Sequence, residues 1–323
     1  MRFPRALAGV AVAVLAPGCT SDAEPSPTTL SPEVSTSAPP TTVAPLSAPV
    51  RYQPIAGEPA PEVKQLASDV VQALATYESS ATPLDEARRR LAGLAVVGDI
   101  AAEAGALLAP DVAARGDIVY PQLGGLTAQR ASVMVVLLQR IRGPGGDSAT
   151  SRTVDVRLDR PAGSSWSVTS LASTGGEPPG TATPLSTLAS DVLAHKNIDM
   201  ADSARWDIQA GRIADRLLAL LVELAATHSL RLTVLATGHP HNVFASANVS
   251  NHTVGRAVDI WAVDGRPVVD QRQPDGALTE LARSLLARGV TELGGPWDLD
   301  GPGGASFTNT VHQDHLHLAF DAA

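Results

Sequence analysis

Two short segments near the C-terminus combine imidazole and carboxylate side chains at spacings that suit a catalytic metal site. The first is Ser-Asn-His-Thr-Val-Gly-Arg-Ala-Val-Asp at residues 250–259, and the second is Asp-His-Leu-His at residues 314–317. A catalytic zinc ion takes three protein ligands and keeps a fourth position open. We predict that His252, Asp259 and His317 are these ligands and that Asp314, three residues before the last of them, is the general base.

The elements that carry these residues are predicted to be strands. Asp259 lies in residues 257–263, an apolar run with β-branched side chains that is typical of a buried strand. A carboxylate there is costly unless it is paired or binds a metal. His315 and His317 alternate with leucines in a second predicted strand, so both imidazoles face one side. Two adjacent strands would bring the predicted ligands to one point.

The joint pattern carries more weight than any single residue. A lone aspartate in a strand is usually a hydrogen-bonding residue, and an isolated His-x-His is a weak metal signal. Six of the eight histidines, however, fall between residues 239 and 317: His239, His241, His252, His312, His315 and His317. This clustering favours a zinc site over scattered structural histidines.

The spacing Ser-x-His-x-x-Gly-x-Ala-x-Asp at 250–259, followed by Asp-His-x-His at 314–317, resembles the zinc D-alanyl-D-alanine carboxypeptidases. These share a small α+β zinc-binding core with the lysostaphin-type and hedgehog-type domains. The resemblance covers about residues 185–323. It implies a Zn²⁺ cofactor, peptidoglycan peptides as substrates, and a metallopeptidase of the D,D-carboxypeptidase type.

Carried over residue by residue, the resemblance assigns a role to six side chains. Zinc ligation falls to His252, Asp259 and His317, activation of the zinc-bound water to Asp314, a position facing the substrate to His315, and support of the first ligand to Ser250. An alternative makes His315 the ligand. We set it aside because His312, not a carboxylate, would then lie three residues upstream.

One departure from the family concerns substrate binding. Family members often carry an arginine, in Ser-Gly-Tyr-Arg or a similar sequence, upstream of the first ligand. Here Pro240 occupies that place, and His239 and His241 are candidate substitutes. Trp297, in a Gly-rich loop, is a candidate lining residue of the cleft or a core residue. Two alternatives stay open: a weak or inactive zinc-stabilised lipoprotein that binds peptidoglycan or protein, and a zinc hydrolase of another amide or ester.

The N-terminus predicts export and anchoring. Residues 1–18 combine two arginines with a short apolar stretch, as in a signal peptide. Ala-Pro-Gly-Cys at residues 16–19 resembles a bacterial lipobox, which predicts Cys19, the single cysteine, as a lipidated residue. Residues 19–57 form a linker rich in Ser, Thr and Pro. We therefore expect a protein anchored by lipid at the outer face of the bacterial cytoplasmic membrane.

Two α+β domains are expected after this linker. Residues 58–178 show helical periodicity and then short strands, which suggests a cystatin-like or nuclear-transport-factor-like unit of unknown role. Residues 183–323 contain the predicted zinc domain, a small antiparallel sheet with flanking helices, one of which is predicted to run from about residue 203 to residue 228. The formal charge of −9 argues against a nucleic-acid partner.

Overall fold

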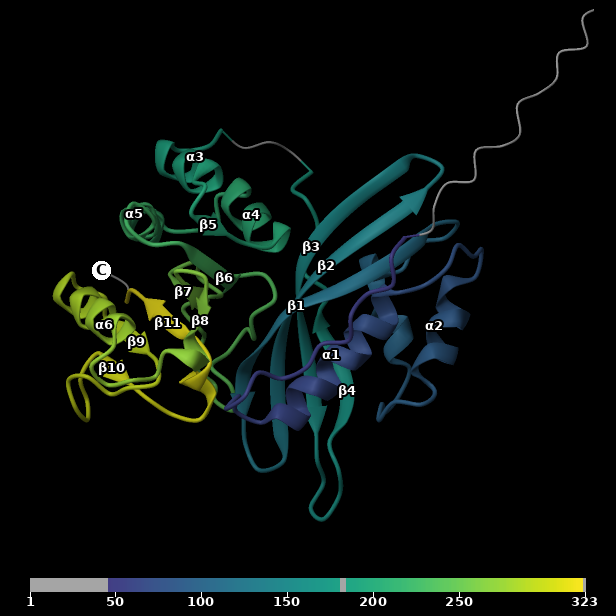
Figure 1. Ribbon diagram of the computed structural model, residues 1–323, viewed down its shortest axis with the longest axis horizontal. Coiled ribbons are helices and arrows are strands. Elements are labelled where there is room, and N and C mark those ends of the chain that lie inside the picture. The colour runs from purple at the N-terminus through teal and green to yellow at the C-terminus, as the bar shows by residue number, and fades with distance from the viewer. Residues whose placement is uncertain (1–45, 181–183, 322–323) are drawn as a thin grey trace, which may run out of the picture. The chain divides into compact units, whose positions relative to one another are not determined.

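An antiparallel sheet forms the first half of the described chain. The computed structural model describes residues 46–180 and 184–321 (Figure 1). The strands of this sheet lie in the order β1 (Ala113–Leu126), β2 (Arg130–Gly143), β3 (Gly146–Asp159) and β4 (Ser167–Ser173). The short strands expected after the helices of this region are thus present. Because β1 is an edge strand, its outer edge can contact another part of the molecule.

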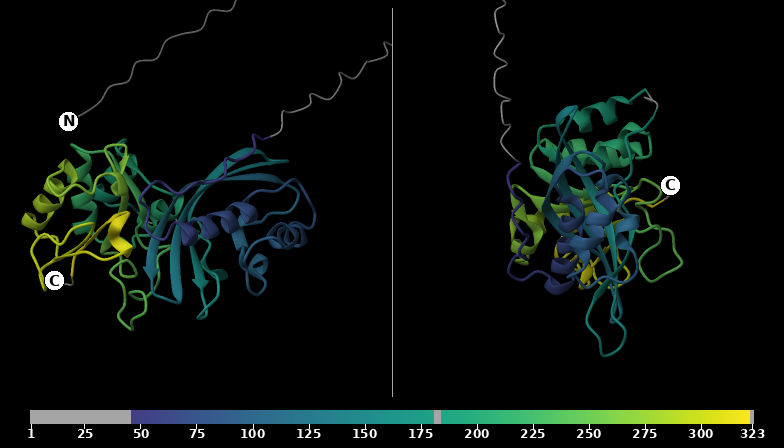
Figure 2. Two further views of the ribbon diagram at one scale, coloured as in Figure 1. Left: turned by 60° about the horizontal axis from the view of Figure 1, so that its bottom comes forward. Right: turned by 90° about the vertical axis from the view of Figure 1, so that its right-hand side faces the viewer.

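Helix α1 (Pro61–Ala75) lies across one face of this sheet (Figure 1 and Figure 2). It begins with a proline, whose fixed φ suits a first helical turn. Its apolar stripe packs on the strands through Val63, Ala67, Val70, Val71 and Leu74. Lys64, next to this stripe, is also fully buried, which is unusual for a lysine. Shorter elements follow: α2 (Pro83–Leu91) and the 3₁₀ turns Ile100–Glu103 and Gly105–Leu107.

A mixed sheet forms the second half of the chain. Its strands lie in the order β10 (Ser306–Phe307), β9 (Glu292–Gly294), β11 (Leu316–Ala319), β7 (Ala257–Val263), β6 (Leu230–Val234) and β5 (Ile198–Asp199), with β8 (Arg266–Pro267) beside β7. The strand predicted at residues 257–263 has the bounds of β7. β11 pairs antiparallel with β7, and the register sets His317 opposite Asp259. The α+β class is thus confirmed for both halves.

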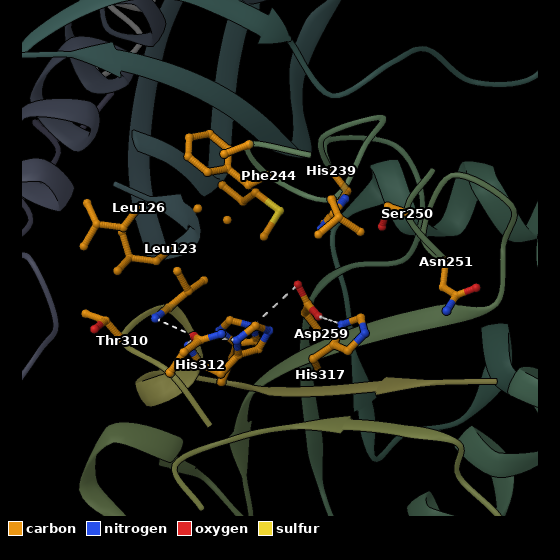
Figure 3. Close-up of a pocket in the computed structure, with 18 of the residues that line it drawn as sticks. Leu123, Leu126, His239, Phe244, Ser250, Asn251, Asp259, Thr310, His312 and His317 are labelled. Carbon is orange, nitrogen blue, oxygen red and sulfur yellow. Dashed lines mark hydrogen bonds and ion pairs between the residues drawn. The ribbon is translucent and has the colours of Figure 1, made fainter. Parts of the chain in front are cut away.

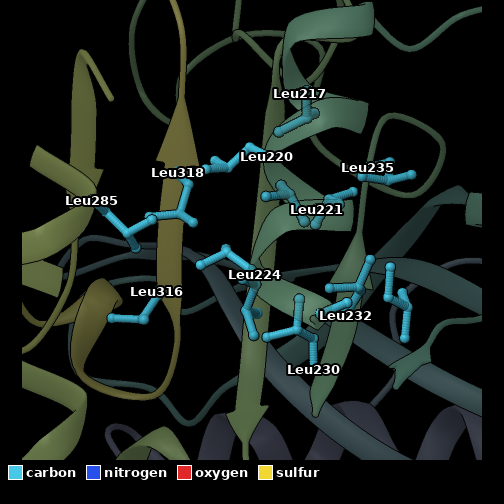
Figure 4. Packing of buried hydrophobic residues seen from close by; sticks show 14 of the residues in the cluster. Leu217, Leu220, Leu221, Leu224, Leu230, Leu232, Leu235, Leu285, Leu316 and Leu318 are labelled. Atoms are coloured by element: carbon cyan, nitrogen blue, oxygen red, sulfur yellow. The ribbon is translucent and has the colours of Figure 1, made fainter. Parts of the chain in front are cut away.

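Four helices and the sheet enclose the second core, and Figure 4 shows leucines of this core, among them Leu221, Leu285 and Leu318. They are α3 (Thr187–Ala194), α4 (Asp202–Gln209), α5 (Asp215–Ala225) and α6 (Ala277–Ala287), and two 3₁₀ turns lie at Val268–Asp270 and Val311–Gln313. Val258 and Ile260 of β7 face this core. Because side chains alternate along a strand, Asp259 and Trp261 face the other side of the sheet.

The single helix predicted from about residue 203 to residue 228 is wrong. The structure has two helices, α4 and α5, separated by residues 210–214. The physical reason is that this segment holds the loop before β7, since the Ala214 N–H donates to the Gly255 carbonyl over 2.9 Å. Asp207 of α4, fully buried, accepts from the N–H groups of Ala236 and Thr237 at the start of the same loop. Tertiary contacts therefore override the helical periodicity.

We refer to residues 46–176 as the N-terminal domain and to residues 184–321 as the C-terminal domain. Each has its own apolar core, and together they lie in one compact unit. Between the cores, Tyr120 of β1 stacks on Trp261 of β7 with ring centroids 4.6 Å apart. Thr153 of β3 also donates to the Thr233 carbonyl over 2.6 Å. The face of the second sheet that is turned away from its helices thus packs against the first domain.

The predicted anchor cannot be placed on this fold. The predicted signal peptide and Cys19 lie outside the described residues. Within residues 46–180 and 184–321, no helix is both long and apolar enough to cross a bilayer.

Candidate metal centre

Three predicted ligands meet on the face of the second sheet that packs against the first domain, and Figure 3 shows two of them, Asp259 and His317, side by side. Asp259 and His317 lie opposite each other on β7 and β11, and the Asp259 Oδ1 to His317 Nδ1 distance is 2.9 Å. His252, from the loop before β7, places Nε2 3.1 Å from Asp259 Oδ1 and 3.2 Å from His317 Nδ1. The three donor atoms therefore form a small, nearly equilateral triangle.

This triangle fits a tetrahedral zinc ion. Ligand atoms about 2.0–2.1 Å from zinc lie about 3.3 Å from one another in a tetrahedron. The observed separations of 2.9, 3.1 and 3.2 Å are a few tenths of an ångström shorter. Two imidazole nitrogens and one carboxylate oxygen are also the donor types of catalytic zinc sites.

His239 adds a further possible donor. Its ligand atom and those of His252 and Asp259 all lie within 4.8 Å of one another, so these three residues could hold a metal ion. The ring of His239 stacks on that of His252 with centroids 4.0 Å apart. Burial, and then the neighbouring His252, hold the pKa of His239 well below its usual value, which keeps a nitrogen lone pair available.

Each of the three predicted ligands also has a partner on its far side. His252 Nδ1 lies 2.6 Å from the Leu235 carbonyl, which fixes Nε2 as the atom that faces the triangle. Gln122 of β1 donates from Nε2 to Asp259 Oδ2 over 2.7 Å. Such outer contacts orient metal ligands and tune their basicity. Gln122 was not predicted from the sequence, because an isolated glutamine in a strand carries no spacing signal.

The third ligand, His317, contacts a carboxylate at the edge of the site. Its Nε2 lies 3.5 Å from Glu292 Oε2, and Asn251 donates to the same oxygen over 2.8 Å. Burial lowers the pKa of His317, but Asp259 and then Glu292 raise it more, to about 9. A metal ion must therefore displace a proton from this imidazole at neutral pH. Glu292 was also missed, since its short strand has no motif.

Asp314 occupies a different place from the one its spacing implied. Its side chain is fully buried and does not line the cavity. Asp314 Oδ2 lies 2.5 Å from Lys64 Nζ and accepts from the Leu123 N–H over 3.1 Å, while Oδ1 lies 2.6 Å from His315 Nδ1. Burial raises the pKa of this carboxyl, but Lys64 and His315 lower it more. Asp314 is an ionised partner of His315, set back from the cavity.

His315 lines the cavity beside the triangle. Its Nε2 lies 3.9 Å from Asp259 Oδ2, and its Nδ1 faces Asp314. When Nδ1 carries the proton donated to Asp314, Nε2 is left with a lone pair toward the site.

The other predicted contact residues divide into two groups. Ser250 and His239 line the cavity, and Ser250 Oγ accepts from the His252 N–H over 3.3 Å. His241 is exposed and acts through its carbonyl, which accepts from the Ser250 N–H over 3.0 Å. Trp297 packs in the core and donates to the Arg272 carbonyl over 3.2 Å. Neither His241 nor Trp297 lines the cavity.

The cavity has a volume of about 550 Å³ and walls from both domains. The N-terminal domain contributes a mainly apolar side, made of Leu123, Gly124, Gly125, Leu126, Thr127 and Met134. Phe244 of the opposite loop packs on Gly125, where an added Cβ would lie 2.0 Å from its ring. Among the described residues that line the cavity, Asp259 and Glu292 are the acids, and none is lysine or arginine.

Comparisons with known proteins add little to this geometry. No protein-family model and no curated protein matches the chain. A solved structure that is similar in part is an IcmL-like type IV secretion system protein from Legionella pneumophila. It is 16% identical, the match covers 39% of this chain and 99% of that chain, and the TM-score is 0.30. A TM-score this low supports no conclusion about function.

Proposed function

We propose that this protein is an exported, lipid-anchored zinc peptidase that acts on peptidoglycan peptides. The observation that carries the proposal is the convergence of His252, Asp259 and His317 at 2.9–3.2 Å beside an open cavity. The sequence resemblance to zinc D,D-peptidases, with their hedgehog-type fold, supports the substrate class. The predicted lipobox at Cys19 supports the location.

The roles of the residues follow from their positions. His252, Asp259 and His317 would hold the metal, which when bound supplies a Lewis acid and lowers the pKa of a water ligand to about 7. The lone pair on His315 Nε2 is placed to accept a proton from the cavity and return it to the leaving amine. Asp314 keeps the His315 proton on Nδ1 and stabilises the imidazolium. Asp314 thus orients and stabilises His315, the proposed base, without facing the cavity.

The charge of the cavity favours one kind of peptide bond as the site of cleavage. A carboxypeptidase must accommodate the free carboxylate of its substrate, which arginine recognises best. Among the described residues that line the cavity there is no such cation, and Glu292 adds a negative charge. We therefore favour an internal amide, as in a peptide cross-link, over a terminal D-Ala-D-Ala bond. Glu292 also favours an amine on the substrate.

A second candidate is a zinc-stabilised binding module without turnover. The observation that favours it is His239, whose ligand atom lies within 4.8 Å of those of His252 and Asp259. A fourth protein ligand would close the coordination sphere, as in structural zinc sites. His239→Ala separates the two proposals: a peptidase keeps its zinc, whereas a closed structural site loses most of its affinity.

Digestion of defined muropeptides tests the proposed activity. Full-length protein with zinc should cleave a cross-linked dimer and leave a monomeric pentapeptide stem largely intact, as read by mass spectrometry. His252→Ala, matched for expression and folding, is the control for a contaminating peptidase. Release of terminal D-alanine alone would restore the carboxypeptidase assignment. Binding of muropeptides without any product would support the binding module instead.

A further inference from the structure

We infer that the N-terminal domain completes the metal centre, with Gln122 and Lys64 as positioning residues that act through Asp259 and Asp314. The inference rests on the proposed function for its catalytic part, whereas its metal-binding part stands on the contacts alone. No residue of the N-terminal domain is a predicted ligand. Three donors from this domain nevertheless reach the two carboxylates of the site.

Gln122 determines how Asp259 presents its oxygens. Its side chain is fully buried, and its Nε2 donates to Asp259 Oδ2 over 2.7 Å. Asp259 Oδ1 is then the atom directed at His252 and His317. Gln122 Oε1 has no hydrogen-bond partner among the described residues, so the contact with Asp259 is the one this buried amide makes. Leaving the Oε1 of a buried amide without a partner costs stability, so the hydrogen bond to Asp259 is the contact that offsets this cost.

Lys64 plays the corresponding part for Asp314. It is fully buried on α1, where it pairs with Glu58 and Asp314 and lies 3.4 Å from the Tyr120 hydroxyl. A buried lysine is costly unless it is paired in this way. Together with the Leu123 N–H, Lys64 occupies Asp314 Oδ2 and leaves Oδ1 to His315.

The consequence is a chain of contacts from the first helix of one domain to the reactive histidine of the other. Lys64 holds Asp314, Asp314 holds Nδ1 of His315, and His315 Nε2 is left facing the cavity. The tautomer of a catalytic histidine is set by the hydrogen bond that its other nitrogen makes. The N-terminal domain therefore contributes to catalysis without a catalytic residue of its own.

Gln122→Met in the full-length protein tests the metal-binding part. Methionine has a similar length and no donor, so Asp259 Oδ2 loses its partner. Zinc affinity, measured by competition with a chromophoric chelator, should fall about 10–100-fold, the usual effect of losing such a contact. Wild-type affinity in this variant would overturn the role of Gln122.

Ser203→Ala is the matched control. Ser203 lies at another part of the same interface, accepts from the Thr153 N–H and donates to the Gly175 carbonyl. It contacts no residue of the site. Its zinc affinity and turnover should equal those of the wild type. If Ser203→Ala weakens zinc as much as Gln122→Met does, the effect is general loosening of the interface, and the inference fails.

The double variant Glu58→Gln with Lys64→Met tests the contact behind His315. It removes one anion and one cation together, which limits the loss of stability. Zinc affinity should stay within about threefold of the wild type, while kcat should fall at least about tenfold with little change in KM. In ¹⁵N NMR of zinc-free protein, the proton on His315 Nδ1 should lose its predominance over Nε2. An unchanged tautomer and kcat would overturn the role of Lys64.

These outcomes separate the inference from the proposed function. If wild-type protein cleaves no muropeptide, the proposed function fails, and the zinc affinity of Gln122→Met still decides the metal-binding part. If the wild type is active and both variants behave like Ser203→Ala, the inference fails alone. If the double variant does not fold, as shown by circular dichroism, Gln122→Met carries the test.

Discussion

The two domains contribute to the site in opposite ways. In the C-terminal domain, the buried polar residues at the site include His252, Asp259 and the Asp314–His315 pair, and the third predicted ligand, His317, is 11% exposed. In the N-terminal domain, the corresponding buried residues are Gln122 and Lys64, which reach those carboxylates from outside. The predicted ligands and the Asp314–His315 pair thus come from one domain, and the donors that contact their carboxylates come from the other. A domain without a recognisable chemical motif can therefore still contribute contacts to a candidate metal centre.

The largest expected effect comes from removing a predicted metal ligand of the C-terminal domain. His252→Ala or Asp259→Ala should abolish binding of the one zinc ion expected per chain, because two donors seldom retain zinc. Metal content after dialysis, measured by mass spectrometry, checks this. Full occupancy in both variants would show that the metal, if any, lies elsewhere.

Asp314→Asn is expected to have the next largest effect. The variant should retain zinc, because Asp314 is not a ligand, but kcat should fall about 10²–10⁴-fold. An amide in place of the carboxylate no longer holds the His315 proton on Nδ1. Retained turnover in a folded variant would mean that neither Asp314 nor its contact with His315 matters for catalysis.

The difference in stability between the wild type and Asp314→Asn should depend on pH in a defined direction. Asp314 has a folded pKa below its ordinary value, because Lys64 and His315 outweigh burial. Such a carboxyl adds stability above its unfolded pKa of about 3.9, and this is lost as the pH falls through the folded pKa. Wild type should exceed Asp314→Asn by about 3 kcal/mol at pH 6, with the gap closing below about pH 4. Urea unfolding at several pH values measures it, and a constant gap would contradict the ion pair.

Glu292→Gln should have the smallest effect. Its contact with His317 is long, at 3.5 Å, and its side chain is 41% exposed. We expect zinc affinity to fall less than about tenfold. His317 holds the pKa of Glu292 down, to about 2, so this carboxylate is charged between pH 5 and pH 8. Chelator competition at neutral pH measures the change, and a loss of affinity as large as that of Gln122→Met would contradict the peripheral position of Glu292.

The sequence predicted those parts of the site that a single domain determines. The strand at residues 257–263 was predicted with its observed bounds, and its register with β11 brings His317 to Asp259 as alternation required. Gln122 and Lys64 were not predicted, because they reach the site through packing between domains. No spacing along the chain records a contact between residues 64 and 314.

The broken helix and the unexpected surroundings of Asp314 have the same origin. The helix predicted from about residue 203 to residue 228 breaks because its middle segment bonds the loop that carries His252. Asp314 has the spacing of a general base, but a lysine from another domain occupies one of its oxygens. In both cases a long-range contact determines a structural feature that the local sequence pattern cannot predict.

A zinc-edge anomalous difference map of the full-length protein would test the central claim most directly. We predict one peak about 2.0–2.2 Å from His252 Nε2, Asp259 Oδ1 and His317 Nδ1, with Gln122 still bonded to Asp259 Oδ2 and a fourth position open to the cavity. A peak that is also bound by His239 would indicate a closed structural site. The absence of a peak at these three residues would contradict the account.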